Sequence, residues 1–209
     1  MKINEIFYSL QGEGLLTGTP SVFLRTSGCN LRCSFCDTTY AYEKGTIMNI
    51  KEILDEVTKF HCNYVCLTGG EPLLQKQTSQ LINILLSKNY KVCLETNGSK
   101  SIKRFVGRNF LFISLDIKCP SSGVHKQMNM SNILYLKKKD QLKFVIKNKQ
   151  DYEYAKKILG KYNPVCPVFF QPVWGANPKK LASWILDDGL SVRLSLQIHK
   201  IIWGSRKRV

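Results

Sequence analysis

The stretch Gly28-Cys-Asn-Leu-Arg-Cys-Ser-Phe-Cys-Asp37 places three cysteines, Cys29, Cys33 and Cys36, in the spacing C-x3-C-x2-C. It directly follows the apolar run Phe23–Thr26, which we predict to be a β-strand. A loop of this spacing can turn three thiolates toward one iron–sulfur cubane, and three thiolates on four irons leave one iron without a protein ligand. The spacing therefore favours a [4Fe–4S] cluster whose open iron can bind a further molecule.

A structural zinc site is the first alternative for these cysteines, and simple packing of the thiols is the second. Structural zinc takes four ligands, usually as two C-x2-C pairs. The chain has no second pair, and its three histidines, at positions 61, 125 and 199, are far away in sequence. The number of ligands thus favours the cluster over zinc.

Outward from this loop, apolar runs that we predict to be strands alternate with amphipathic runs. The strands are predicted at Phe23–Thr26, Tyr64–Leu67, Lys91–Glu95, Leu111–Asp116, Leu142–Ile146 and Val165–Phe170. Several are apolar nearly throughout, which is typical of parallel strands covered on both faces.

Four helices are predicted between these strands. One spans 49–60, with Asn49 as N-cap and Glu52 completing a near capping box. A second ends at Lys88, a third lies in 150–160 and is closed by Gly160, and a fourth covers 178–186. Alternating strands and helices indicate an α/β fold with right-handed crossovers. Six β/α repeats are too few for an eight-fold barrel, so we expect an open, partial TIM-like barrel, with one crossover, at 121–139, formed by a loop.

Length and composition restrict the class of protein. At 209 residues the chain suits a single domain, 1–209, that can bury a core without disulfides. It has no apolar run of the ~20 residues that span a bilayer, and its start, MKINEIFYSL, does not resemble a secretory signal. We therefore expect a cytoplasmic protein whose eight cysteines serve metal or redox chemistry. The formal charge of +16 leaves open either a solvated basic surface or a polyanion contact.

A second motif makes the assignment more specific. Leu67-Thr-Gly-Gly-Glu-Pro72 closes the second predicted strand, and Phe35 is an aromatic residue directly before the third cysteine. Together these motifs resemble the radical S-adenosylmethionine superfamily. The resemblance implies that S-adenosylmethionine binds the open iron of the cluster. It also implies that one electron then cleaves the cofactor to a 5′-deoxyadenosyl radical, which abstracts hydrogen from substrate.

Within that superfamily, nearly the whole chain resembles 7-carboxy-7-deazaguanine synthases. The matching segments are Phe7–Gly14, Phe23–Arg25, Cys36–Thr38, Asp116–Gly123, Gln171–Pro172, Gln197–His199 and Trp203–Val209. The family converts 6-carboxy-5,6,7,8-tetrahydropterin to 7-carboxy-7-deazaguanine with loss of ammonia, in queuosine- and archaeosine-type 7-deazapurine biosynthesis. The resemblance implies regeneration of S-adenosylmethionine, assistance by Mg²⁺, a homodimer, and an electron donor such as flavodoxin or ferredoxin. It gives no reason to expect direct contact with nucleic acid.

The resemblance also implies ligand-binding residues. For the cluster these are Cys29, Cys33 and Cys36, and for magnesium Thr38. For S-adenosylmethionine they are Phe35, Cys36, Asp37, Gly69, Gly70, Glu71, Asp116, Ile117, Lys118 and Gln171. For the pterin they are Leu10, Gln11, Gly12, Glu13, Arg25, Thr68, His199 and the carboxylate of Val209. Asp116 and Ile117 stand where many relatives have Ser-Pro.

The chemistry of these side chains suits a pterin. Arg25 can hold a carboxylate with two hydrogen bonds, and Gln11 and Glu13 can pair with a guanine-like edge. Bland alternatives exist for some of them: an ordinary glycine loop at 11–14, a helix cap at Thr38, and a structural role for His199.

Two other functions share some of these sequence features. A glycyl-radical activating enzyme also has C-x3-C-x2-C, but it acts on a large partner protein. A basic, zinc-containing nucleic-acid-binding module would explain the positive charge, but the chain has no stacking-aromatic RNA motif.

Overall fold

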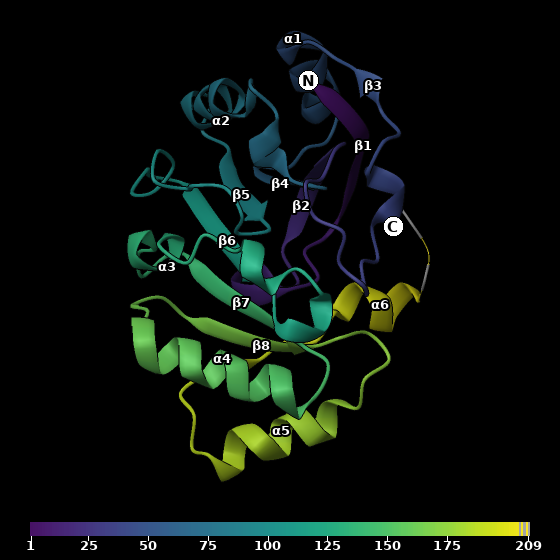
Figure 1. Cartoon of the computed structure of the whole chain (residues 1–209). Coiled ribbons are helices and arrows are strands. Elements are labelled where there is room, and N and C mark those ends of the chain that lie inside the picture. The colour runs from purple at the N-terminus through teal and green to yellow at the C-terminus, as the bar shows by residue number, and fades with distance from the viewer. Residues whose placement is uncertain (205, 207, 209) are drawn as a thin grey trace.

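The chain folds around one mixed β-sheet, shown in Figure 1, in a computed structural model that describes residues 1–204, 206 and 208. The strands follow the order β3-β1-β2-β4-β5-β6-β7-β8-β9, so β3 and β9 are the two edges of an open sheet. Strands β2 and β4 to β9 run parallel, while β1 is antiparallel to β2 and β3. The bounds are β1 Lys2–Leu10, β2 Pro20–Thr26, β3 Thr46–Ile47, β4 Tyr64–Gly69, β5 Lys91–Thr96, β6 Leu111–Ile117, β7 Gln141–Ile146, β8 Val168–Pro172 and β9 Arg193–Leu194. All six predicted strands are present, although β8 begins at Val168 and not at Val165 as predicted.

The two faces of the parallel strands differ in chemistry because side chains alternate across a sheet. Leu24, Leu67, Leu94, Leu115 and Phe144 belong to one buried core that packs under the helices. On the other face, polar side chains of successive strands line a common cavity: Arg25, Thr68, Glu95, Asp116, Lys143 and Gln171. The apolar face therefore builds the fold, and the polar face builds the site.

Figure 1 shows the larger helices around the outside of the sheet. Their bounds are α1 Ile50–Thr58, α2 Thr78–Ser87, α3 Asn132–Tyr135, α4 Lys149–Tyr162, α5 Pro178–Asp187 and α6 Ile198–Trp203. Asn49 caps α1 as predicted: its side chain accepts from Glu52 N at 3.0 Å, and Glu52 Oε2 accepts from Asn49 N at 2.8 Å. None of the helices in the described part of the chain is long and apolar enough to cross a membrane.

The end of α4 differs from the prediction. Gly160 lies inside the helix, which continues to Tyr162 and ends at Asn163 in the left-handed conformation, with φ +40°. Asn163 N donates to Leu159 O at 2.9 Å, so an asparagine closes the helix where a glycine was expected. The crossover at 121–139 is mostly loop, as predicted, with two 3-10 turns and the four-residue α3.

Strand β1 was not predicted, because apolar and polar residues are mixed in its sequence. No short hairpin turn joins it to its partner β2 either, since β1 ends at Leu10 and β2 begins at Pro20. The ring of Phe7 stacks on that of Phe23 across the pair, with centroids 5.1 Å apart. Because β1 is antiparallel to β2, it ends beside Pro20, at the amino ends of the parallel strands. The segment Gln11–Glu13 consequently forms the floor of the cavity, and the cysteine loop forms its rim.

Candidate active site

A cavity of about 750 Å³ opens on the polar face of the sheet. Most of the predicted ligand residues line it: Leu10, Gln11, Gly12, Glu13, Arg25, Cys29, Cys33, Phe35, Cys36, Asp37, Thr38, Thr68, Gly69, Gly70, Asp116, Lys118, Gln171 and His199. Glu71 and Ile117 do not line it, and Val209 lies outside the described residues. Residues from distant parts of the sequence thus share one cavity.

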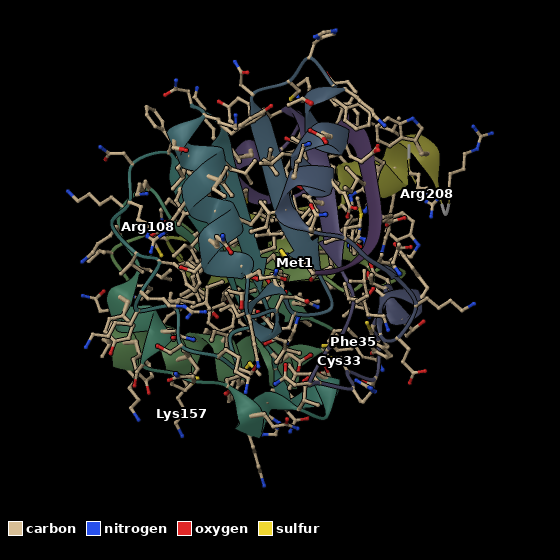
Figure 2. The ribbon with its side chains drawn as sticks, turned by 90° about the horizontal axis from the view of Figure 1, so that it is seen from above. Met1, Cys33, Phe35, Arg108, Lys157 and Arg208 are labelled. Carbon is tan, nitrogen blue, oxygen red and sulfur yellow. The ribbon has the colours of Figure 1, made fainter. Side chains whose placement is uncertain are left out.

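The cysteine loop is held by backbone contacts on both sides. Gly28 N donates to Ala41 O at 2.9 Å, and Ser34 N donates to Ser122 O at 3.0 Å. All three thiols are free and partly exposed to the cavity, and Figure 2 shows Cys33 close to Phe35 on this loop. Burial raises the pKa of the Cys33 thiol, and the nearby positive charge of Lys118 offsets part of that rise.

The three thiols of the cysteine loop are not gathered closely enough to bind one zinc ion together. A single ion needs its ligand atoms close together, because Zn–S bonds are only about 2.3 Å long. Among the described residues, the cysteine loop supplies no such group of atoms within 4.8 Å; the group that meets this limit is Cys66, Cys93 and Glu95. Donors also reach the sulfur of Cys29: Leu31 N at 3.4 Å and Asn97 Nδ2 at 3.7 Å. Hydrogen bonds to the sulfurs are a usual feature of iron–sulfur sites.

The Gly69–Gly70 turn packs against the start of the cysteine loop. A Cβ on Gly69 would lie 2.2 Å from Thr26 O, and a Cβ on Gly70 would lie 2.2 Å from Gly28 O. Gly69 also has a φ of +142°, which side chains rarely adopt. Glycine is therefore required for the close approach of two backbones, and this contact fixes the turn beside the cysteines.

Glu71 supports the site from behind the cavity wall. Its carboxylate is fully buried and accepts hydrogen bonds from Thr96 Oγ1, from Asn97 N at 2.7 Å and from Leu73 N at 3.0 Å. Burial raises its pKa, although these bonds oppose the rise. The Glu71 side chain therefore holds the segment that contains Asn97, whose side chain donates to the sulfur of Cys29. The side chain of Ile117 is likewise turned into the core.

Gln171, at the end of β8, lines the cavity and has an unsatisfied side-chain oxygen. Its Oε1 is buried and finds no hydrogen-bond donor among the residues that the structure describes. Buried polar atoms are normally paired, so an orphaned oxygen in a cavity wall indicates a missing partner. A bound molecule with a donor group would satisfy it.

The floor is organised around two carboxylates. Glu95 accepts from Gln11 Nε2 at 3.1 Å and from Thr68 Oγ1 at 2.8 Å. Glu13 accepts from Lys143 Nζ at 2.6 Å and from Gln197 Nε2 at 2.7 Å. Burial would raise the pKa of Glu13, but the Lys143 charge and these bonds outweigh it and lower the pKa.

Helix α6 closes the floor of the cavity. His199 lies within α6, and Ile198 N donates to Gly12 O at 3.1 Å. A Cβ on Gly12 would lie 1.8 Å from His199 Nδ1, so the glycine permits this contact. Burial lowers the pKa of His199 and favours the neutral imidazole.

Arg25 points into the cavity from β2 and is held by Glu5 on β1. Its Nε donates to Glu5 Oε1 at 2.7 Å, and Tyr40 Oη donates to the same oxygen at 3.0 Å. Burial would raise the pKa of Glu5, but hydrogen bonds from Arg25 and its neighbours lower it. The ion pair uses the Nε of the guanidinium and fixes the direction of the whole group.

Thr38 does not act as a side-chain helix cap. It precedes the 3-10 turn Thr39–Ala41, but its side chain makes no capping bond and donates to Asp37 Oδ1 at 2.9 Å. Asp37 pairs with Lys200 of α6 at 2.5 Å, and the pKa of Asp37 falls to about 2 because this pair outweighs the effect of burial. Two oxygen-bearing side chains therefore stand together at the rim.

Sequence reasoning missed Glu5, Glu95 and Lys143. Each is a charged residue inside a strand: Lys143 is the single charge in β7, whereas β1 and β5 each also begin with a lysine. That pattern was the available signal, since a charge in a covered strand needs a partner. The pattern does not indicate which residue the partner is, because the partner can be distant in sequence: Glu13 and Lys143 are 130 residues apart.

Comparison with known proteins agrees with this geometry. Residues 23–159 match the model of the radical SAM superfamily. The chain is 41% identical over 204 residues to the 7-carboxy-7-deazaguanine synthase of Thermoplasma acidophilum, covering 98% of each chain. It is 42% identical over 218 residues to that of Chlorobaculum tepidum, covering 100% of this chain and 96% of the relative. The crystal structure of QueE from Escherichia coli has the same fold, with a TM-score of 0.71 at 21% identity over 94% of this chain and 93% of that one. The chain belongs to the 7-carboxy-7-deazaguanine synthase family of the radical SAM superfamily.

Proposed function

We propose that this chain converts 6-carboxy-5,6,7,8-tetrahydropterin to 7-carboxy-7-deazaguanine with loss of ammonia. One observation carries the proposal: the cysteine loop, the glycine turn, the Gln11–Glu13 floor and Arg25 all line the same cavity. A cavity of about 750 Å³ is within the usual range for a small-molecule site. A glycyl-radical activating enzyme would instead have to admit a segment of a partner protein.

The rim residues fit the cofactors. Cys29, Cys33 and Cys36 would hold the [4Fe–4S] cluster, and the orphaned Gln171 Oε1 and Lys118 would bind S-adenosylmethionine. When bound, these groups supply one-electron chemistry that removes a hydrogen atom from the substrate. The glycine turn, Phe35 and Asp37 would complete the rim and exclude water.

The floor residues fit the pterin. Arg25 would bind its carboxylate, because a guanidinium offers parallel N–H donors to a carboxylate. Glu13 is held ionised by Lys143, so its oxygens would accept from the N–H groups of the guanine-like edge. Gln11 and Thr68 are oriented by Glu95, and neutral His199 can both donate and accept.

Thr38 is our proposed magnesium ligand. Its hydroxyl is a hard oxygen beside the Asp37 carboxylate, and Mg²⁺ commonly keeps water and substrate oxygens in addition to one or two protein ligands. We further propose a flavodoxin- or ferredoxin-type electron donor, a homodimer, and activity in the cytoplasm, where thiols stay reduced.

The test is an anaerobic assay of the reconstituted chain with carboxytetrahydropterin, S-adenosylmethionine, Mg²⁺ and a reductant. The proposal predicts 7-carboxy-7-deazaguanine, identified by mass spectrometry, together with ammonia, and slower turnover without Mg²⁺. The Cys29→Ala variant is the control and should neither form product nor cleave S-adenosylmethionine. Cleavage by that variant, or an unreacted pterin with the wild-type chain, would count against the proposal.

A further inference from the structure

Lys143 is a buried ammonium in the middle of an apolar strand. It lies in β7, whose sequence is Gln-Leu-Lys-Phe-Val-Ile, and only 7% of the residue is exposed. Burying a charge is costly unless it is paired and hydrogen-bonded. The structure supplies two partners, and each comes from a different part of the cavity.

The first partner belongs to the floor and the second to the rim. Lys143 Nζ lies 2.6 Å from Glu13 Oε2 and 3.2 Å from Asp116 Oδ1. The other oxygen of Asp116 lies 2.8 Å from Lys118 Nζ, and the charge of Lys118 acts on Cys33 of the cysteine loop. Lys143 therefore links Glu13 on the floor to a chain of ion pairs that continues through Asp116 to Lys118 at the rim.

The register of the sheet holds this chain of charges in place. Asp116 and Lys143 are directly opposite each other on the neighbouring strands β6 and β7. Glu13 is fixed on its other side by Gln197 Nε2 at 2.7 Å, which comes from the segment before α6. The pKa values of Glu13 and Asp116 are both lowered, because the lysine charges outweigh the effect of burial. Both carboxylates are therefore ionised at neutral pH.

We propose that Lys143 is a positioning residue that holds Glu13 toward the pterin and Asp116 toward S-adenosylmethionine, and so couples the binding of the two molecules. The inference rests on the proposed function, because it takes Glu13 as a pterin ligand and Asp116 as part of the cofactor segment. Two ligands that order the same buried group favour each other's binding, and such coupling is reciprocal.

The first test measures binding of 6-carboxypterin, the oxidised form of the substrate, by fluorescence on the cluster-loaded enzyme. Lys143→Met keeps the length of the side chain but removes its charge, and it should weaken binding at pH 7 by about 10- to 100-fold, as expected for a lost hydrogen bond to a charged group. Lys143→Arg should recover most of the affinity. Lys156→Met on α4 is the matched control, since it removes an ion pair with Asp188 at the end of α5, outside the cavity, and should leave binding unchanged.

The pH dependence separates positioning from simple loss of structure. Glu13 faces Lys143 on β7, Asp116 on β6, and Gln197 and His199 at α6. Without Lys143, the bond from Gln197 remains to favour the charged form of Glu13, while burial and the charge of Asp116 both disfavour it. The acid limb of 6-carboxypterin binding should therefore move to higher pH in Lys143→Met and should return in Lys143→Arg.

The second test measures coupling directly. In the wild-type enzyme, 6-carboxypterin should tighten the binding of S-adenosylmethionine, and in Lys143→Met this effect should shrink toward onefold. During turnover, Lys143→Met should also release more 5′-deoxyadenosine per product. Suppose that the wild-type chain turns over the pterin and that Lys143→Met changes neither the pterin affinity nor the coupling. This result would overturn the inference about Lys143 and leave the proposed function intact. A wild-type chain that neither binds 6-carboxypterin nor turns over the pterin overturns the proposed function, and the inference with it.

Discussion

At the scale of single residues, the site is built from polar side chains on the cavity-facing side of neighbouring strands. Arg25 and Thr68 are opposite each other on β2 and β4, and Asp116 and Lys143 are opposite each other on β6 and β7. The cysteine and glycine motifs could be predicted because their residues are contiguous in sequence. The partner of Arg25 could not, because β1 was not recognised as a strand and its pairing places Glu5 beside Arg25. The partner of Glu13 could not, because Lys143 is 130 residues away in sequence.

Glu71 shows how a motif residue can act without facing the cavity. Glu71→Gln replaces the oxygen that accepts from Asn97 N, or the one that accepts from Leu73 N, with an amide donor. We expect a loss of about 1–3 kcal/mol in the free energy of unfolding, the usual cost of an unsatisfied buried group. Anaerobic urea unfolding measures it.

The matched control for that change is Glu153→Gln on the exposed surface of α4. Glu153 pairs with Lys149 and Lys156, and all three side chains are substantially exposed. Exposed pairs contribute about 0–1 kcal/mol. Equal losses in the two variants would mean that the Glu71 carboxylate has no special structural role.

At the scale of elements, the sequence predicted best where a local signal decides the structure. Six strands and the start of α1 follow from apolar runs and from a cap. The end of α4 was predicted wrongly, since Gly160 was taken as the stop and Asn163 provides it. The short edge strands β3 and β9 have two residues each and leave almost no pattern, because tertiary pairing alone defines them.

The capping box of α1 gives a test at this scale. Asn49→Ala removes the side chain that accepts from Glu52 N and leaves the bond from Asn49 N to Glu52 in place. It should lower the free energy of unfolding by about 1 kcal/mol. Ser131→Ala is the control, because Ser131 occupies the N-cap of α3 without a capping bond and should cost about 0.5 kcal/mol or less. A loss for Ser131→Ala as large as that for Asn49→Ala would contradict the account.

At the scale of the whole molecule, an open sheet leaves one polar face free for ligands, and the chain carries a formal charge of +16. In the cavity, buried carboxylates pair with lysine and arginine side chains. The open fold could be predicted from the number of β/α repeats. The position of the floor could not, because it depends on the antiparallel direction of β1.

This balance predicts how stability depends on pH. The pKa values of Glu5, Glu13 and Asp116 are below their ordinary values of 4.5, 4.5 and 3.8. The unfolded chain therefore takes up protons first, so these groups contribute stability above about pH 5 that is lost as the pH falls through their folded pKa values. The melting temperature should fall below pH 5, and added salt should raise it more at pH 4.5 than at pH 7, because it screens the growing positive charge. A melting temperature that is flat down to pH 4 would contradict this.

The central claim is that one cavity binds both the cofactors and the pterin substrate. The most direct test is the amount of 7-carboxy-7-deazaguanine formed per S-adenosylmethionine by the reconstituted, reduced chain with carboxytetrahydropterin and Mg²⁺. Our account predicts several products per S-adenosylmethionine and little 5′-deoxyadenosine. Accumulation of 5′-deoxyadenosine while the pterin stays unchanged would contradict it.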